Sequence, residues 1–173
     1  LVERLRPEIL VVSEDNCYRG GMLISPRHFR ELCMPSYREI ASVARDCGVP
    51  AVTVDSDGNV MELVPLLDEC GVNAILPCEV KAGNDLFALR RRFPKFVLMG
   101  WLEKETLNEG NEGAIRPELE RKVPGLLRAG RYFPNGDHGI QPPVTFPNLC
   151  RFLTLLHELT GNPEGEFPRT RPA

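Results

Sequence analysis

Short apolar runs alternate along the chain with longer amphipathic segments. Four runs are clear and a fifth is weaker: Ile9–Val12, Ala51–Val54, Ala74–Leu76, Phe96–Met99 and Arg131–Phe133. Continuous apolar runs are typical of strands that are buried on both faces of a parallel sheet. The pattern therefore predicts parallel strands joined by helices in right-handed crossovers.

The segments between the runs predict helices. The first helix is expected to begin at Ser25–Pro26, a capping hydroxyl followed by proline, and to end at Gly48, with a kink at Pro35. Four more helices are expected over residues 60–70, 85–91, 112–128 and 147–159. The organisation predicted is one folded unit over residues 1–161 and a polar, proline-rich tail over 162–173.

Two α/β architectures fit this alternation, an open doubly wound sheet and a TIM (β/α)₈ barrel. No glycine-rich phosphate-binding motif follows any of the strands, which weakens the case for a nucleotide-binding open sheet. A complete barrel takes about 250 residues, and five strands are too few to close one. Either the sheet is open, or the chain is part of a longer barrel.

Composition and charge narrow the function classes. The chain has 173 residues, of which 42% are hydrophobic and 26% charged, and its net charge of −3 gives no electrostatic case for nucleic-acid or membrane binding. No apolar stretch in the sequence is long enough to span a membrane, and we expect no secretory signal peptide. The six cysteines form no C-x-x-C pair, which predicts reduced core thiols in a cytoplasmic protein.

Polar residues follow each predicted strand. The carboxyl ends of parallel strands meet at one edge of a sheet, where ligands bind in both architectures. The candidates at this edge are Glu14, Asp15, Asp55, Asp57, Glu79, Trp101, Asp137 and His138. Acidic groups gathered in one cleft repel one another, so such a cluster persists when it holds a cation, handles protons or binds a cationic substrate.

Each candidate also has a plainer interpretation. Asp57 lies in an Asp-Gly-Asn stretch that suits a turn or a helix cap, and Asp15 could face solvent in a loop. His138, between Asp137 and Gly139, is the best single candidate, with a simple loop histidine as its alternative. Trp101 could stack on a planar ligand or cover the mouth of a barrel. Cys78 beside Glu79 is a metal ligand or, more simply, a packing residue.

Five motifs at these strand ends resemble the uroporphyrinogen decarboxylase superfamily, which includes the corrinoid methyltransferases. They are Tyr18–Arg27, Asp55–Asn59, Leu76–Val80, Val97–Gly100 and Gly136–Ile140. They occur in the family's order and cover nearly the whole chain. The resemblance implies a TIM barrel of which this chain is the C-terminal portion, about five strands, with the amino-terminal strands missing.

The resemblance also implies alternative chemistries. His138 matches the decarboxylase histidine, while the methyltransferase branch uses a His-x-Cys pair and a later cysteine as zinc ligands. Asp55, Asp57 and His138 stand at those three positions, so a bound metal would have oxygen and nitrogen ligands instead of thiolates. Uroporphyrinogen carries eight carboxylates, which this acidic cleft would repel by about 4 kcal/mol for a pair of charges 4 Å apart.

Three hypotheses follow for the intact protein. In the first, it is a divergent enzyme that acts on a small substrate by metal-assisted methyl or group transfer. Its metal, expected to be zinc, is held by Asp55, Asp57, Glu79 and His138, and a corrinoid protein is a candidate partner. His138, Glu79 and Asp57 are catalytic, and Asp15, Trp101 and Asp137 contact the substrate. The second is uroporphyrinogen decarboxylation without a cofactor. The third is an inactive half-barrel that pairs with a second copy or with a missing amino-terminal half.

Overall fold

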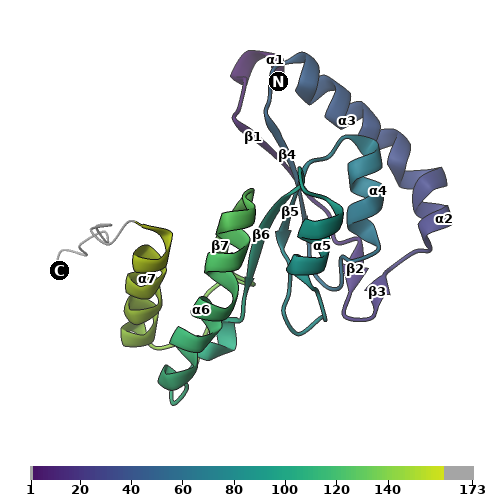
Figure 1. Cartoon of the computed structure of the whole chain (residues 1–173). Coiled ribbons are helices and arrows are strands. Elements are labelled where there is room, and N and C mark those ends of the chain that lie inside the picture. Colours follow the sequence, from purple (N-terminus) through teal and green to yellow (C-terminus); the bar gives the residue numbers. More distant parts are fainter. Residues whose placement is uncertain (1, 162–173) are drawn as a thin grey trace.

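The computed structural model describes residues 2–161, and these contain one parallel sheet of five strands. The strand order in the sheet is β1-β4-β5-β6-β7, which is also the order in which these strands occur along the chain (Figure 1). The strands are β1 (Ile9–Ser13), β4 (Ala51–Ser56), β5 (Ala74–Pro77), β6 (Val97–Leu102) and β7 (Tyr132–Gly136). This is the predicted α/β class, an open arc of parallel strands that fits part of a TIM barrel.

Helices α3 to α6 lie between consecutive strands of the parallel sheet, and α7 follows β7. Figure 1 shows α3 to α6 on the same side of the sheet. The longer helices are α3 (Met34–Asp46), α4 (Leu63–Cys70), α5 (Leu86–Arg92), α6 (Glu112–Ala129) and α7 (Phe146–Thr160). Short elements are α1 (Val2–Leu5), α2 (Pro26–His28), the π-helical turn η1 (Phe29–Cys33) and the 3₁₀ turn η2 (Lys104–Leu107).

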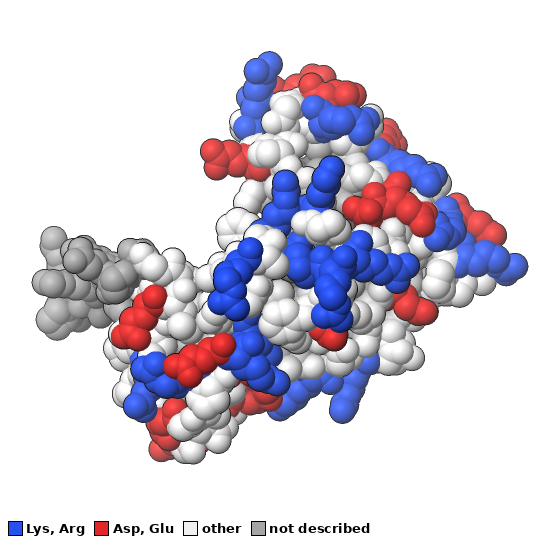
Figure 2. Space-filling model, viewed as in Figure 1, with Lys and Arg blue, Asp and Glu red and all other residues white. Residues whose placement is uncertain are grey.

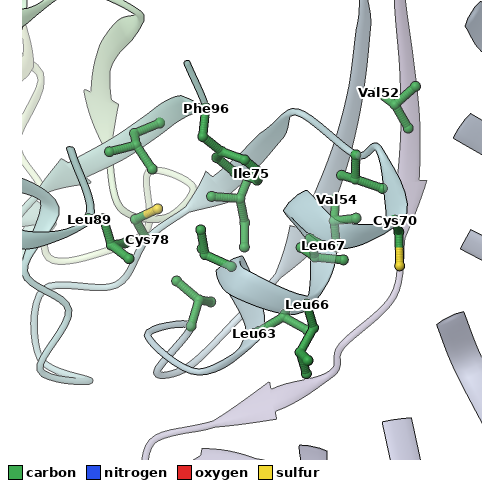
Figure 3. Packing of buried hydrophobic residues seen from close by; sticks show 14 of the residues in the cluster. Val52, Val54, Leu63, Leu66, Leu67, Cys70, Ile75, Cys78, Leu89 and Phe96 are labelled. Carbon is green, nitrogen blue, oxygen red and sulfur yellow. The ribbon is translucent and has the colours of Figure 1, made fainter. Parts of the chain in front are cut away.

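The main core lies between the sheet and these helices. Val52, Val54 and Ile75 point from β4 and β5 toward α4, where Leu63 and Leu67 meet them, and all five are almost completely buried (Figure 3). A second apolar cluster lies where α6 packs on α7. Side chains alternate across a strand, so the face of the sheet away from the helices carries the intervening residues, among them Thr53 and Asp55.

The first long helix is irregular next to Pro35, where a kink was predicted. The structure inserts the π-helical turn η1 just before the proline, and the Met34 N–H donates to the Phe29 carbonyl. A proline has no N–H to donate to the preceding turn, and a π-turn is one way in which a helix accommodates such an irregularity. Helix α6 runs without a break through Pro117 and Pro124, close to the range predicted for it.

A two-stranded hairpin, β2 (Cys17–Tyr18) with β3 (Gly21–Met22), follows β1 and was not predicted as strands. It lies against the carboxyl end of β4, where the Asn59 N–H donates to the Tyr18 carbonyl at 3.0 Å. The hairpin therefore covers one side of the loop that carries Asp57.

Lys and Arg gather on the helix-covered face, over α5 and its surroundings, as Figure 2 shows. Arg91 and Arg92, at the end of α5, are exposed. No helix among residues 2–161 has the length and hydropathy needed to cross a membrane. The predicted tail, 162–173, lies outside the described residues.

Candidate functional site

Three strand ends bring an acid–imidazole cluster together at one edge of the sheet. Asp57 follows β4, Glu79 follows β5 and His138 follows β7. One ligand atom from each side chain lies within 4.8 Å of the other two. The sequence predicted this convergence, because the carboxyl ends of neighbouring parallel strands share one edge.

Two of the three spacings in the cluster are close to those expected around a shared cation. The His138 Nε2 atom lies 3.5 Å from the Asp57 Oδ1 atom and 3.5 Å from the Glu79 Oε1 atom. Ligand atoms held about 2.0–2.1 Å from a tetrahedral zinc ion lie about 3.3–3.4 Å apart. Two carboxylate oxygens and an imidazole nitrogen are ligands that zinc accepts, and the Asp57 side chain is half exposed, which leaves the cluster open on one side. In ligand type, the three side chains therefore fit zinc or another divalent cation.

Glu79 is held in place by the neighbouring loop. Its Oε1 atom accepts a hydrogen bond from the Gly58 N–H at 2.7 Å, and only 22% of its side chain is exposed. This bond joins the β5 end to the residue that follows Asp57. The two carboxylates are thus tied to each other through the main chain.

Asp15, predicted to contact the substrate, lies beside the cluster. Its Oδ1 atom accepts a hydrogen bond from the Asp57 N–H at 3.1 Å, and the residue is exposed. It is placed to orient Asp57, and its contact with a substrate stays a prediction.

Asp137 joins the ends of three strands. It is almost completely buried, and its two oxygens accept hydrogen bonds from the N–H groups of Val80 at 3.0 Å and Lys104 at 3.1 Å. The His138 Nδ1 atom lies 3.9 Å from the Asp137 Oδ1 atom. Both carboxylate oxygens are therefore occupied in fixing the loops that surround His138, and its predicted contact with a substrate is untested.

Asp55 lies apart from the three-residue cluster. Its carboxylate accepts a hydrogen bond from the Ser13 hydroxyl at 3.4 Å, on the strand next to it. Among the described residues, the group with metal-ligand geometry consists of Asp57, Glu79 and His138. A ligand role for Asp55 stays a prediction.

Trp101 lies under the helix layer. Its indole N–H donates to the Asn84 carbonyl at 2.8 Å, the Phe87 ring meets it edge-on at 5.6 Å, and the Lys122 ammonium lies 4.4 Å from its centre. Only 8% of the residue is exposed, so in this arrangement the ring offers little surface to a ligand. Its predicted stacking on a substrate is untested.

The cysteines near the cluster remain protonated at neutral pH. Burial raises the pKa of the Cys78 thiol to about 12, against a smaller lowering effect of a backbone hydrogen bond at Met99. Burial likewise raises the pKa of Cys17 to about 11, although the Ser56 hydroxyl bonded to it acts in the opposite direction. The thiolate is the form that binds metal, so these two residues are suited to packing.

An open apolar pocket of about 320 Å³ adjoins the loop of His138. It is lined by this loop together with η2 and α7, including His138, Gly139, Ile140, Leu149, Phe152 and Leu156. A pocket of this size suits a small molecule or one part of a larger one.

Sequence reasoning missed Asn84, which the structure places at the centre of the loops behind the cluster. Asn84 is 6% exposed, and its side chain hydrogen bonds to Gly58, Val60 and Glu79. The signal that could have found it is its position five residues after Glu79, in a polar stretch just before the Asp85 cap of α5.

The fold and the cluster together define a partial β/α barrel with polar chemistry at the strand carboxyl ends, the place where barrel enzymes carry their active sites. The family described as uroporphyrinogen decarboxylase (URO-D) matches residues 10–159, and the chain belongs to that family. A comparison with curated proteins gives no match.

Among solved structures, the chain is similar to a methyltransferase from Methanosarcina mazei, with 18% sequence identity and a TM-score of 0.62. The matched region covers 88% of this chain and 42% of the methyltransferase chain. At this identity the likeness shows the fold, and the present chain spans less than half the length of that relative.

Proposed function

We propose that the intact protein is an enzyme that holds a divalent ion, zinc by its ligands, between Asp57, Glu79 and His138, and that it carries out metal-assisted methyl or group transfer on a small substrate. The observation that supports this most strongly is the meeting of three ligand atoms, from three separate strand ends, within 4.8 Å. When bound, the ion would supply Lewis-acid chemistry at the open side of the cluster.

The residues of the chain have distinct tasks in this proposal. His138 offers its Nε2 atom and Glu79 its Oε1 atom, which the Gly58 N–H holds in place. Asp57 offers a carboxylate oxygen and is oriented at its main chain by Asp15. Asp137 fixes the loops that follow β5 and β6, which keeps the histidine next to it close to both carboxylates.

Charge and size favour a small, weakly charged substrate. Among the described residues, the ion-pair partner of both Asp57 and Glu79 is His138, and neither carboxylate is paired with a lysine or an arginine. Without a bound cation, these two carboxylates would repel a substrate that carries many carboxylates. The apolar pocket beside His138 gives room for an uncharged part of a small molecule.

A second candidate is decarboxylation of uroporphyrinogen without a cofactor, which the description of the matching family favours. In that reaction His138 would orient a substrate carboxylate, and positive groups for the other carboxylates would have to come from elsewhere in the intact protein. Turnover of uroporphyrinogen by the metal-free intact protein would support this candidate over the first.

Partners and location follow from the same proposal. A corrinoid protein is the proposed methyl carrier for the transfer reaction, and a second copy or additional β/α units would complete the barrel. Six cysteines without a disulfide among the described residues support a reducing compartment, and we place the protein in the cytoplasm on that basis.

Zinc titration by calorimetry tests the metal site. The unaltered chain is expected to bind one equivalent, and His138→Ala is expected to lower the affinity about 100-fold or more, because a lost ligand costs more than a lost supporting contact. Asp55→Ala tests whether Asp55 is a fourth ligand. Unchanged zinc affinity would leave Asp57, Glu79 and His138 as the protein ligands. A loss of affinity as large as that of His138→Ala would add Asp55 to them.

His28→Ala is the matched control, because His28 is exposed on α2 and bonds to Ser25 there. It is expected to bind zinc as the unaltered chain does. Equal zinc content in the unaltered chain, His138→Ala and Asp55→Ala would contradict the metal site.

A further inference from the structure

We propose that Asn84 is a positioning residue for this cluster: its side-chain amide holds the Asp57 and Glu79 loops at the separation that a shared cation requires. This inference rests on the proposed function for the identity of the ligands. The holding of the two loops itself can be measured without a metal.

The Asn84 amide nitrogen bridges the two loops directly. Its Nδ2 atom donates to the Gly58 carbonyl at 2.9 Å and to the Glu79 carbonyl at 2.8 Å. Gly58 is the residue after Asp57, and Glu79 is itself a proposed ligand. One NH₂ group therefore fixes the main chain at Glu79 and at the residue that follows Asp57.

The remaining polar atoms of Asn84 complete the arrangement. Its Oδ1 atom accepts a hydrogen bond from the Val60 N–H at 2.9 Å, and its main-chain carbonyl accepts one from the Trp101 indole at 2.8 Å. Each of these bonds lies in a buried setting, where a lost partner is not replaced by bulk water. The residue thus connects the loops that follow β4 and β5 with β6.

The chemistry of the amide explains why another side chain would not serve. Two carbonyl oxygens that accept from the same nitrogen lie close together, and without the two N–H groups between them they repel each other. The loops would then move apart, and the Gly58 N–H would lose its short bond to the Glu79 carboxylate. The same movement would separate the oxygens of Asp57 and Glu79 that lie around His138.

A second buried asparagine offers a matched control. Asn148 is 3% exposed, and its Nδ2 atom donates to the carbonyls of Leu107 and Asn108, each at 3.1 Å. It makes the same kind of bridge between two carbonyls, but it ties α7 to η2 and contacts no proposed ligand. A general cost of removing a buried amide is therefore shared by both residues, and an effect on the cluster is expected for Asn84 alone.

The experiment compares Asn84→Asp with Asn148→Asp in the full chain. Aspartate has nearly the same shape as asparagine but no N–H donor, so it places an oxygen opposite the two carbonyls. Two quantities are measured: zinc affinity by calorimetry, and the hydrogen-exchange rate of the Gly58 amide by NMR without metal. Asn84→Asp is expected to weaken zinc binding about 10- to 100-fold and to speed Gly58 exchange at least about 10-fold, whereas Asn148→Asp changes neither.

The outcomes separate this inference from the proposed function. Unchanged Gly58 exchange in Asn84→Asp overturns the positioning role, whatever the zinc affinity. Faster Gly58 exchange with no zinc binding even by the unaltered chain overturns the metal site and leaves the positioning role supported. If Asn84→Asp does not fold, Asn84→Ala replaces it, because alanine removes the donor without adding a charge. Equal effects of the Asn84 and Asn148 variants on Gly58 exchange would show a general loss of stability and overturn the inference.

Discussion

Lys122 and Glu118 form a buried ion pair behind the strand that carries Trp101. Lys122 is 1% exposed, and its ammonium donates to the Trp101 carbonyl at 2.7 Å as well as to Glu118. Glu118 also accepts hydrogen bonds from the Glu103 N–H at 3.0 Å and from Arg121 at 2.7 Å. The pair therefore fixes the carboxyl end of β6, next to Trp101.

The protonation of Glu118 makes the stability of the fold depend on pH. Burial alone would raise the pKa of this carboxyl, but the hydrogen bonds from Lys122, Glu103 and Arg121 outweigh it and hold the pKa below its ordinary value. The ionised form is thus favoured in the folded state. The stability that it contributes is complete above the ordinary carboxyl pKa and is lost as the pH falls through the lower, folded-state pKa.

We expect Glu118→Gln to lower the free energy of unfolding by about 3–5 kcal/mol at pH 7, because it leaves the Lys122 charge buried and unpaired. The difference from the unaltered chain should shrink as the pH falls below the folded-state pKa of Glu118. Urea unfolding over a series of pH values measures both effects. Glu120→Gln is the control, since Glu120 pairs with Arg116 at the surface of the same helix and should change stability by less than about 1 kcal/mol. A difference in the free energy of unfolding between Glu118→Gln and the unaltered chain that stays the same at every pH would contradict the argument.

At the scale of elements, the pattern of apolar runs predicted the parallel strands and the long helices, because that periodicity follows directly from burial. The cluster of Asp57, Glu79 and His138 was predictable once the parallel strands were, because their carboxyl ends lie at the same edge of the sheet whatever conformation the loops adopt. Asn84 was not, since its role depends on which carbonyls the folded loops present to it. The hairpin β2–β3 escaped prediction because two-residue strands carry no periodic signal.

The end of α5 shows how a local pattern misleads. A run of three arginines is typical of a solvated helix end. Arg90, however, is buried, and its guanidinium donates to the carbonyls of Phe93, Pro94, Phe96 and Arg131. The carbonyls that accept these hydrogen bonds belong to the turn before β6 and to the residue just before β7, so only the tertiary fold reveals them.

The hairpin and the Asp57 loop approach each other so closely that Gly58 is required. Its φ angle is +84°, and a Cβ atom added there would lie 2.5 Å from the Tyr18 carbonyl carbon and oxygen. Gly48 has a similar φ angle of +74° but open space around it. A side chain at either position would strain the backbone, but only at Gly58 would it also clash with a neighbouring segment.

We expect Gly48→Ala to cost about 1–2 kcal/mol, the strain of a left-handed alanine. Gly58→Ala should cost about 1–3 kcal/mol more, because the hairpin backbone has to move, and it should also weaken zinc binding. Thermal unfolding and zinc titration of both variants provide the measurements. Equal stability of the two variants would show that the hairpin backbone moves away from residue 58 without a measurable loss in the free energy of unfolding, which would contradict the prediction.

At the scale of the whole molecule, the sheet is open on the side away from the helices. Leu10 and Val12 of β1 pack against the core, so Ile9 and Val11 point to the opposite face, where 50% and 53% of their surface is exposed. Phe133 on β7, 58% exposed, stands at the other edge of the same face. In a closed barrel this face is the packed interior, which side chains from all the strands fill.

Exposed apolar side chains along an open sheet with two unpaired edges favour association. We expect the chain, on its own, to self-associate with increasing concentration, one copy covering the sheet face of another. The double variant Val11→Lys/Phe133→Lys should shift it toward the monomer, because a charge on that face has to be desolvated in the contact. Sedimentation velocity over a concentration series is the measurement.

Leu32→Lys is the control. Leu32 is 70% exposed on η1, within the helix layer, so this substitution should leave the association unchanged. A stable monomer at every concentration would contradict self-association, and a loss of association in Leu32→Lys equal to that of the double variant would place the contact on the helix layer instead of the open sheet face.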